Sequence, residues 1–291
     1  LTGIKTIFYS PAGLLHRINV DAIPVSATET LADRFQLIEL NSTRQLVVAN
    51  EIKYTNKEAV LYGGVDFDAP GDSATRGGAW NYLPGTENEI NSLEKIMRSA
   101  SLKTNVKKGM DATEESFKRI GSTNSPKILH IATHGYFFPD PKAKAGDSSL
   151  PAGSQEPVFK MSDHPMLRSG LILSGGNKGW EGDRSLEGKE DGVLTAYEIS
   201  QMNLSNTELV VLSACETGLG TIRGNEGVYG LQRAFKIAGA KYLIMSLWQV
   251  PDKQTSLLMT TFYKKWLTGK KTIPNAFHEA QKQLRESGLD P

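Results

Sequence analysis

Two segments of the chain end an apolar run on residues that can do covalent chemistry. The run in "KILHIATHGYFF" (127–138) stops on His134-Gly135, and the run in "ELVVLSACETGLG" (208–220) stops on Cys215, the only cysteine of the sequence. A cysteine attacks as its thiolate, and a nearby histidine can act as its base and electrostatic partner. The residue types therefore predict a Cys215–His134 dyad for nucleophilic catalysis.

The same segments offer backbone donors for the negative charge that develops on an attacked carbonyl. Gly135 has no side chain to block its N–H, and the N–H of Cys215 itself can be the second donor. The residues "TGLG" (217–220) keep the backbone after the cysteine small and bendable. Gly135 and Cys215 are the predicted oxyanion donors.

Each half of the pair also has a plainer interpretation. A lone cysteine after an apolar run is often a small buried hydrophobic residue. A His-Gly at the end of a strand is often a turn. The residues alone leave these alternatives open, because a dyad requires that the two strand ends meet.

Other kinds of site fit the sequence less well. A phosphatase loop needs an arginine six residues after its cysteine, where this chain has Thr221. The stretch "TGKKT" (268–272) lacks the Gly-Lys-Ser/Thr of a phosphate-binding loop. The remaining histidines have no metal-ligand spacing among themselves: His16, His130, His164 and His278. We therefore expect no metal and no cofactor.

The elements that must position the pair alternate along the chain. Apolar, β-rich runs predict strands at Thr6–Ser10, Leu37–Leu40, Ala59–Val65, Lys127–Thr133, Gly170–Ser174, Glu208–Ser213 and Tyr242–Leu247. Near-continuous apolar strands that alternate with helices are typical of a parallel sheet covered on both faces. Ligands of such sheets bind beyond the carboxyl ends of the strands, where both His134 and Cys215 fall.

Helical spacing predicts the intervening segments. The predicted helices are 86–100, 112–120, 227–240, 252–269 and 273–286, together with "TAYEISQM" (195–202). Thr86 and Glu89 predict a capping box at the first of them, and Ala238-Gly239 predicts a glycine C-cap. Two stretches rich in Gly, Pro, Ser and Lys, at 139–167 and 175–192, are predicted as loops that border the cleft.

Composition excludes several classes of protein. The 291 residues are 39% hydrophobic and 22% charged, with a net charge of +1, which does not favour a nucleic-acid partner. No apolar run approaches the length of a membrane helix, so no membrane partner is expected. A single cysteine excludes an intramolecular disulfide and fits a reducing compartment, so we expect a cytoplasmic protein. The start on Leu1 suggests a domain cut from a longer protein or a processed product.

Several segments together resemble the CHAT domain, a caspase-like peptidase domain often found after TPR repeats and distantly related to separase and the caspases. They are "SPAGLLHRINVDAIP", "HIATHGYF", "DGVLTAYEI", "LVVLSACETGLG", "GVYGLQRAFKIAGAKYLIMSLWQVPDKQT", "LMTTFYKKWLTGK" and "AFHEAQKQL". The likeness runs through essentially the whole chain. It implies an α/β, caspase-like three-layer sandwich with a largely parallel sheet, in which His134 is the base and Cys215 the nucleophile.

The resemblance also implies a division of the chain and a set of partners. Residues 1–83 would be a degenerate, caspase-like N-terminal lobe, and residues 84–291 the catalytic lobe. The partners would be a protein substrate and an upstream TPR or sensor module, or a regulatory protein.

Substrate-binding residues are less clearly indicated. In separase an acidic residue four positions beyond the Asp of "LWxVTD" receives arginine, and the matching position here is Ser256. Asp191 and Asp252 are the candidate carboxylates for a basic side chain. Each also has a plain alternative, Asp191 as a turn residue and Asp252 as a helix cap.

Three classes of function follow. The first is a cysteine endopeptidase that an upstream sensor or partner controls. The alternative is a non-catalytic CHAT scaffold, although a scaffold needs neither His134 nor Cys215. The third, a small-molecule hydrolase, would favour a more compact and apolar cleft.

Overall fold

The computed structural model describes most of the chain. The described residues are 3–11, 15, 18–40, 42–47, 56–68, 79–121, 125–138, 162–182, 190–213, 226–246 and 252–289. Cys215 and most of the predicted 139–167 loop lie outside them. The chain divides into two compact units, Leu1–Lys53 with Leu257–Pro291, and Tyr54–Ser256.

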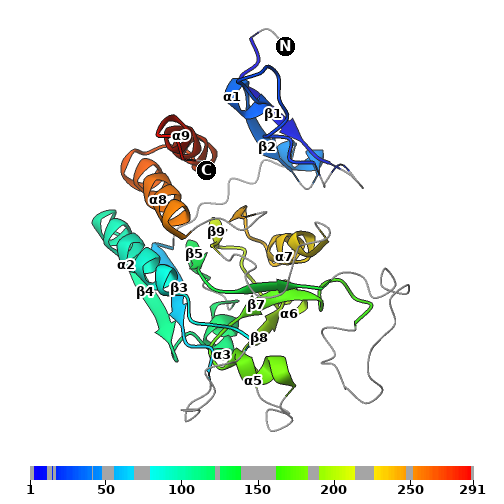
Figure 1. The fold of residues 1–291 in the computed structure, drawn as a ribbon, viewed down its shortest axis with the longest axis vertical. Coiled ribbons are helices and arrows are strands. Elements are labelled where there is room, and N and C mark those ends of the chain that lie inside the picture. Colours follow the sequence, from blue (N-terminus) through cyan, green and yellow to red (C-terminus); the bar gives the residue numbers. More distant parts are fainter. Residues whose placement is uncertain are drawn as a thin grey trace. The chain divides into compact units, whose positions relative to one another are not determined.

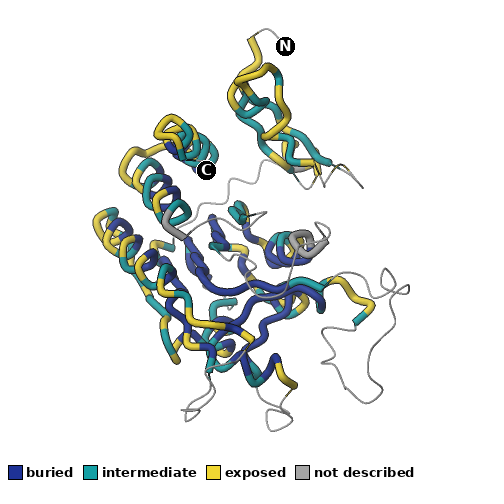
Figure 2. The backbone as a smooth tube through the Cα atoms, viewed as in Figure 1, coloured by how far each residue is buried: buried dark blue, intermediate teal, exposed yellow. Residues whose placement is uncertain are grey.

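The larger unit contains a five-stranded parallel sheet with the strand order β10-β9-β5-β3-β4. Its strands are β3 (Glu58–Val65), β4 (Lys103–Gly109), β5 (Ile128–Ile131), β9 (Leu209–Leu212) and β10 (Tyr242–Met245). β5 and β9 are buried along their whole length, and β3 is buried except at its first residue (Figure 2). The prediction of a parallel α/β sheet, consistent with a caspase-like sandwich, is confirmed.

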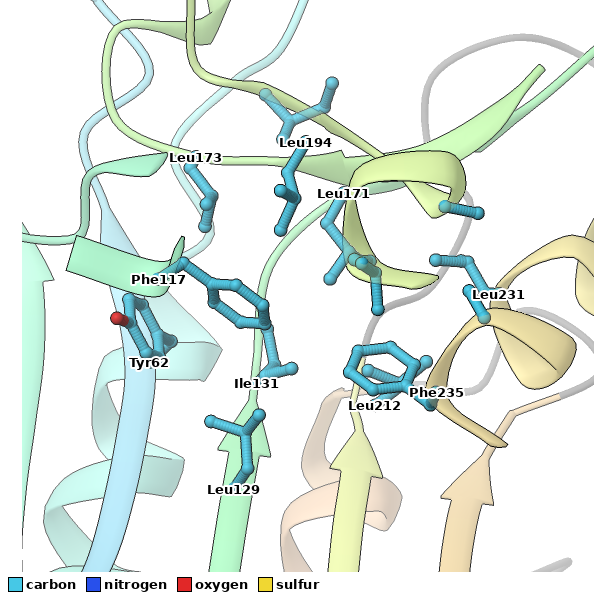
Figure 3. Packing of buried hydrophobic residues seen from close by; sticks show 14 of the residues in the cluster. Tyr62, Phe117, Leu129, Ile131, Leu171, Leu173, Leu194, Leu212, Leu231 and Phe235 are labelled. Atoms are coloured by element: carbon cyan, nitrogen blue, oxygen red, sulfur yellow. The ribbon is translucent and has the colours of Figure 1, made fainter. Parts of the chain in front are cut away.

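A second, three-stranded antiparallel sheet was not predicted. It has the order β6-β7-β8, with β6 (Gly135–Phe137), β7 (Ser169–Ile172) and β8 (Val193–Thr195). Figure 3 shows Leu171 of β7 and Leu194 of β8 in the same hydrophobic cluster as Ile131 and Leu212 of the parallel sheet. The two sheets of this unit therefore share one core, and β6 begins directly after His134.

Five α-helices complete the described part of the larger unit (Figure 1). They are α2 (Pro84–Ser99), α3 (Glu114–Lys118), α5 (Gly176–Glu181), α6 (Ala196–Ser200) and α7 (Glu226–Ile237), with a 3₁₀ turn at Arg119–Gly121. α2 packs against β3 and β4 through its apolar stripe of Ile90, Leu93, Ile96 and Met97. α7 ends before Gly239, whose φ of 104° is the left-handed conformation expected of a glycine C-cap.

The predicted capping box at Thr86 is wrong. The helix starts earlier, with Leu83 at its N-cap and Pro84 in its first turn. The Thr86 hydroxyl donates to the Leu83 carbonyl (2.7 Å) and accepts from Gly64 N (2.9 Å), while Glu89 is buried. Thr86 therefore connects the helix start to β3, and the reciprocal bonds of a capping box are absent from this described helix.

The smaller unit combines the two ends of the chain. It contains the parallel pair β1 (Thr6–Tyr9) and β2 (Gln36–Glu39), with α1 (Leu31–Arg34), a 3₁₀ turn at Thr43–Leu46, a π turn at Lys264–Thr268 and α9 (Ile273–Glu286). α8 (Asp252–Tyr263) spans the boundary between the units. The ion pair between Arg285 and Asp33 (3.1 Å) connects α9 to α1.

These units are not the predicted lobes of residues 1–83 and 84–291. β3, which belongs to the first predicted lobe, pairs with β4 and β5 of the second in one sheet. The origin of residues 1–83 as a degenerate peptidase lobe stays a prediction.

Candidate active site around His134

The strands that lead to His134 and Cys215 are neighbours. β5 and β9 pair in parallel from Ile128 with Leu209 to Ile131 with Leu212, and the bond from Ser213 N to Ile131 O (2.8 Å) continues the ladder. His134 stands as far beyond Ile131 as Cys215 stands beyond Leu212. The two candidate residues thus follow adjacent strands at the same edge and in the same register, although Cys215 itself lies outside the described residues.

A backbone carbonyl orients the His134 ring. Nε2 of His134 lies 2.8 Å from the carbonyl oxygen of Asn81. Because a carbonyl oxygen only accepts, Nε2 must carry the hydrogen of this bond. In the neutral ring Nδ1 is then the basic nitrogen, as a general base requires.

Aromatic side chains hold the same ring in place. The centroids of Phe67 and Trp80 lie 4.9 Å and 5.0 Å from that of His134, and Trp80 in turn packs edge-on against Trp180 at 4.8 Å. His134 is only 3% exposed. The packing restricts rotation of the imidazole and keeps bulk water from most of its surface, so the ring is preorganised.

The register of β6 and β7 determines where the Gly135 amide points. Ile172 N donates to His134 O (2.9 Å), and Phe138 N donates to Arg168 O (2.7 Å). His134 and Ile172 are therefore a hydrogen-bonded pair, and so are Phe138 and Arg168. Because such pairs alternate with non-hydrogen-bonded pairs along an antiparallel ladder, Gly135 and Leu171 form a non-hydrogen-bonded pair. The N–H of Gly135 therefore points away from β7, at the edge of the sheet as described.

The segment that leads to Cys215 is anchored from α2. Glu89 accepts from the Ser213 hydroxyl through Oε2 (3.0 Å), and its Oε1 lies 3.0 Å from Nε2 of His130. His130 is fully buried on β5, and Glu89 is 4% exposed. Since Ser213 precedes Cys215 by two residues, this buried network fixes the point from which the cysteine segment leaves the sheet.

Comparison with known families identifies the chain. It matches the CHAT domain over residues 1–290. The chain belongs to the CHAT domain family. CHAT domains are related to caspase-like peptidases. The paired strand ends that lead to His134 and Cys215 remain the candidate site of this CHAT domain.

Two curated relatives are tetratricopeptide repeat proteins. The CHAT domain is 25% identical over 210 residues to mouse Tetratricopeptide repeat protein 28, a match that covers 72% of the chain and 8% of the relative. It is 24% identical over 272 residues to the human protein of the same name, covering 90% of the chain and 10% of the relative. The chain thus spans about a tenth or less of each relative's length. Within the described residues of the CHAT domain, no helix has the length and apolar character needed to cross a membrane.

Of the two predicted substrate carboxylates, only Asp191 has a described side-chain contact. Asp191 accepts from Val193 N (2.9 Å) in the turn before β8, and burial raises the pKa of its carboxyl. Asp252 begins α8, and its side chain lies outside the described residues. Their role in substrate binding stays a prediction.

A cluster of three carboxylates lies beside this turn. Atoms of Glu114, Glu190 and Glu198 come within 4.8 Å of one another, in an arrangement that could hold a cation. Lys118 supplies that cation: its ammonium lies 2.8 Å from Glu114 and 2.8 Å from Glu198, and also bonds Glu190. Burial raises the pKa of Glu114 to about 8. The cluster joins α3 to α6 through the Lys118 ammonium.

The residues that hold His134 had no signal of their own in the sequence. Asn81 contributes only a carbonyl oxygen, which any residue type provides. Trp80 and Trp180 are of a residue type typical of packing, and nothing in their spacing points to His134. The structure adds that this packing surrounds the candidate base.

Proposed function

We propose that this CHAT domain is a cysteine endopeptidase of the caspase and separase type, with His134 and Cys215 as its catalytic dyad. The observation that supports it most directly is the β5–β9 ladder, which brings the two strand ends to the same edge in register. The second support is the ring of His134, whose tautomer and orientation suit a base.

The reaction would proceed through an acyl-enzyme. Nδ1 of His134 takes the thiol proton of Cys215, and the thiolate attacks the carbonyl carbon of the scissile peptide bond. The N–H groups of Gly135 and Cys215 donate hydrogen bonds to the carbonyl oxygen and stabilise its negative charge. His134 then gives the proton to the leaving amine, the C–N bond breaks, and water hydrolyses the thioester to regenerate the thiol.

The relatives support a link between this domain and tetratricopeptide repeats. They are named for tetratricopeptide repeats, and the chain covers only a small part of each. We infer that an upstream TPR or sensor module, or a regulatory protein, controls access to the dyad, with residues 1–83 as a non-catalytic lobe and a reducing, cytoplasmic setting for the thiol. For the substrate we propose a mild preference for Lys or Arg before the cleaved bond, received by Asp191 or Asp252.

The lone cysteine allows a direct test. Purified wild type, Cys215→Ala and His134→Ala are incubated with a proteome-derived peptide library, and new termini are counted by mass spectrometry. The control is His164→Ala, the same change at an exposed histidine. Cleavage by wild type and control, and its loss in both dyad variants, is the expected result.

Alkylation by iodoacetamide reports on the same pair without a substrate. Because Cys215 is the only thiol, its alkylation rate at pH 7 measures its thiolate fraction. We expect His134→Ala to slow the reaction roughly tenfold or more. No cleavage by any variant, together with equal alkylation rates, would favour the non-catalytic scaffold.

A further inference from the structure

The two segments that enclose His134 are held together by one buried amide. Phe67 and Trp80 lie on either side of residues 69–78, which are outside the described structure, and both contact the imidazole. Asn177, in α5, lies between these segments and is 6% exposed. Asn177 is therefore placed to hold Phe67 and Trp80, the two residues that pack on His134.

Asn177 bonds both segments. Its backbone N donates to Phe67 O (3.0 Å), and its Nδ2 donates to Asp68 Oδ1 (2.8 Å). Its Oδ1 accepts from Trp80 N (2.9 Å), while Nδ2 also donates to Trp80 O (3.1 Å). The side chain therefore pairs with the backbone N–H and C=O of Trp80 as a neighbouring strand would. Through its other two bonds, Asn177 connects Trp80 to the segment that contains Phe67.

These contacts use the amide in a way that no other side chain of the same size can. One oxygen accepts and one nitrogen donates twice, which uses all of the polar hydrogens of the Asn177 side chain. An aspartate would have no hydrogen to donate and would place a carboxylate against Asp68. An alanine would leave the buried N–H and C=O of Trp80 without these partners, at a cost of about 1–3 kcal/mol for each group.

The backbone that Asn177 holds leads directly to the orienting carbonyl. Asn81 follows Trp80, and its carbonyl oxygen accepts from Nε2 of His134. A shift of Trp80 would move both the ring that packs on His134 and the carbonyl that selects its tautomer. Displacements of about 1 Å at such a support can reduce a rate about a hundredfold.

The helix that carries Asn177, α5, packs closely against β7 and the turn before β8. A Cβ on Gly179 would lie 2.3 Å from the carbonyl oxygen of Asp191, and one on Gly176 would lie 2.6 Å from Cγ2 of Ile172. Only glycine permits this approach of α5 to β7 and to the turn before β8. The close packing of α5 thus fixes the position from which Asn177 contacts Phe67 and Trp80.

We propose that Asn177 is a positioning residue for His134: it clamps Phe67–Asp68 to Trp80 and thereby fixes the ring packing and the Asn81 carbonyl that together hold the base in its Nε2–H tautomer. The proposal rests on the proposed peptidase function for its catalytic meaning. Its structural content, the tautomer and orientation of His134, is independent of that function.

The test uses Asn177→Asp, with Asn203→Asp as the control for the same change at an exposed turn. The side-chain ¹⁵N shifts of His134, assigned by comparison with His134→Ala, report its tautomer directly. We expect the wild type and the control to show the Nε2–H form, and Asn177→Asp to show a mixture. With a peptide identified by library cleavage, kcat of Asn177→Asp should fall about 10- to 100-fold with KM changed less than threefold.

The exchange variant Asp68→Asn/Asn177→Asp separates positioning from loss of folding. In this variant the new amide at position 68 can donate to the new carboxylate at position 177, which still accepts from Trp80 N. Folding, the tautomer and part of kcat should therefore recover. A single Nε2–H tautomer and wild-type kcat in a folded Asn177→Asp protein would overturn the proposal, as would an exchange variant that folds without recovering either signal. If no variant cleaves peptide, the peptidase function fails, while the ¹⁵N shifts still decide the role of Asn177.

Discussion

The carbonyl oxygen of Asn81 accepts a hydrogen bond from Nε2 of His134 over 2.8 Å, although the two residues are 53 positions apart in the sequence. The bond gives the imidazole a third group that orients it, as triads of nucleophile, base and orienting acceptor require. Here the orienting group is a main-chain oxygen, which is uncharged. The dipole of the carbonyl fixes the ring without adding a buried carboxylate beside it.

The first prediction concerns the ring that packs on His134. Trp80→Phe keeps an aromatic face on the imidazole, and Nε1 of Trp80 has no hydrogen-bond partner in the described structure, so no bond is lost. Trp80→Leu removes that face, so only Phe67 and the Asn81 carbonyl still hold the ring. We expect kcat within about threefold of wild type for Trp80→Phe and about 10–100-fold lower for Trp80→Leu. Equal rates in a peptide-cleavage assay would show that the packing does not position His134.

The second prediction concerns the Gly135 amide. Because its N–H points away from β7, Gly135→Pro removes a donor without breaking a bond of the β6–β7 ladder. If this N–H stabilises the oxyanion, kcat should fall about 10²–10³-fold. Gly135→Ala keeps the N–H and is the control, expected within about tenfold of wild type. Thermal unfolding should be similar for both variants, and equal losses of kcat would argue against the oxyanion role.

The third prediction concerns the network beneath the cysteine segment. Glu89→Ala removes the carboxylate that contacts the buried His130 and the half-buried Ser213, so urea unfolding should show a loss of about 2–4 kcal/mol. Glu89→Gln keeps one acceptor and should lose less. Ser213→Ala removes a single bond and should cost about 1 kcal/mol. If Glu89→Ala unfolded at the same urea concentration as Ser213→Ala, the His130 contact would contribute nothing.

The same network should affect the thiol. Ser213 is two residues from Cys215. Loss of its hydrogen bond to Glu89 should therefore change the rate at which iodoacetamide alkylates the Cys215 thiol. We expect a slower reaction in Ser213→Ala than in Ser205→Ala, a control at an exposed turn. Identical rates would mean that the anchor at Ser213 does not reach the nucleophile.

The sequence predicted the elements whose signal is local and missed those that depend on tertiary contacts. Every predicted apolar run overlaps a strand. For β3, β5 and β9 the signal is strong because buried parallel strands are apolar almost throughout. β4 was missed because it is an edge strand with three lysines, Lys103, Lys107 and Lys108, and alternating exposure. β6 and β8 have three residues each, too short for periodicity to show.

The candidate site divides in the same way. His134 and the strand ends could be predicted, because reactive side chains after apolar runs are visible in sequence. The support at Asn81, Phe67 and Asn177 could not, because a carbonyl oxygen, a packed ring and a buried amide have no distinctive spacing. Thr86 and Glu89 show the reverse case: their spacing predicts a capping box, but the helix starts earlier and both side chains bond tertiary partners.

The last prediction concerns stability and pH at the cluster around Lys118. Burial raises the pKa of Glu114 from its ordinary value of 4.5 to about 8, and Lys118 only partly offsets this effect. Desolvation alone would lower the pKa of Lys118, but the hydrogen bonds that its ammonium donates to Glu114, Glu190 and Glu198 raise it, so the ammonium stays charged. In the neutral range Glu114 is thus the member of the cluster that changes charge, and it also accepts from Gly192 N (2.9 Å) at the start of β8.

The sign follows from proton linkage. Between pH 4.5 and 8 the folded protein binds more protons at Glu114 than the unfolded chain does, so its free energy of unfolding falls as the pH rises through this window. Glu114→Gln mimics the protonated carboxyl and removes that contribution. Urea unfolding at pH 5, 6.5 and 8 should therefore show the wild type losing stability relative to Glu114→Gln, with most of the loss complete by about pH 8. The exposed Glu115→Gln change should leave the wild-type pH dependence intact, and parallel curves for wild type and Glu114→Gln would show that Glu114 is already ionised at pH 5.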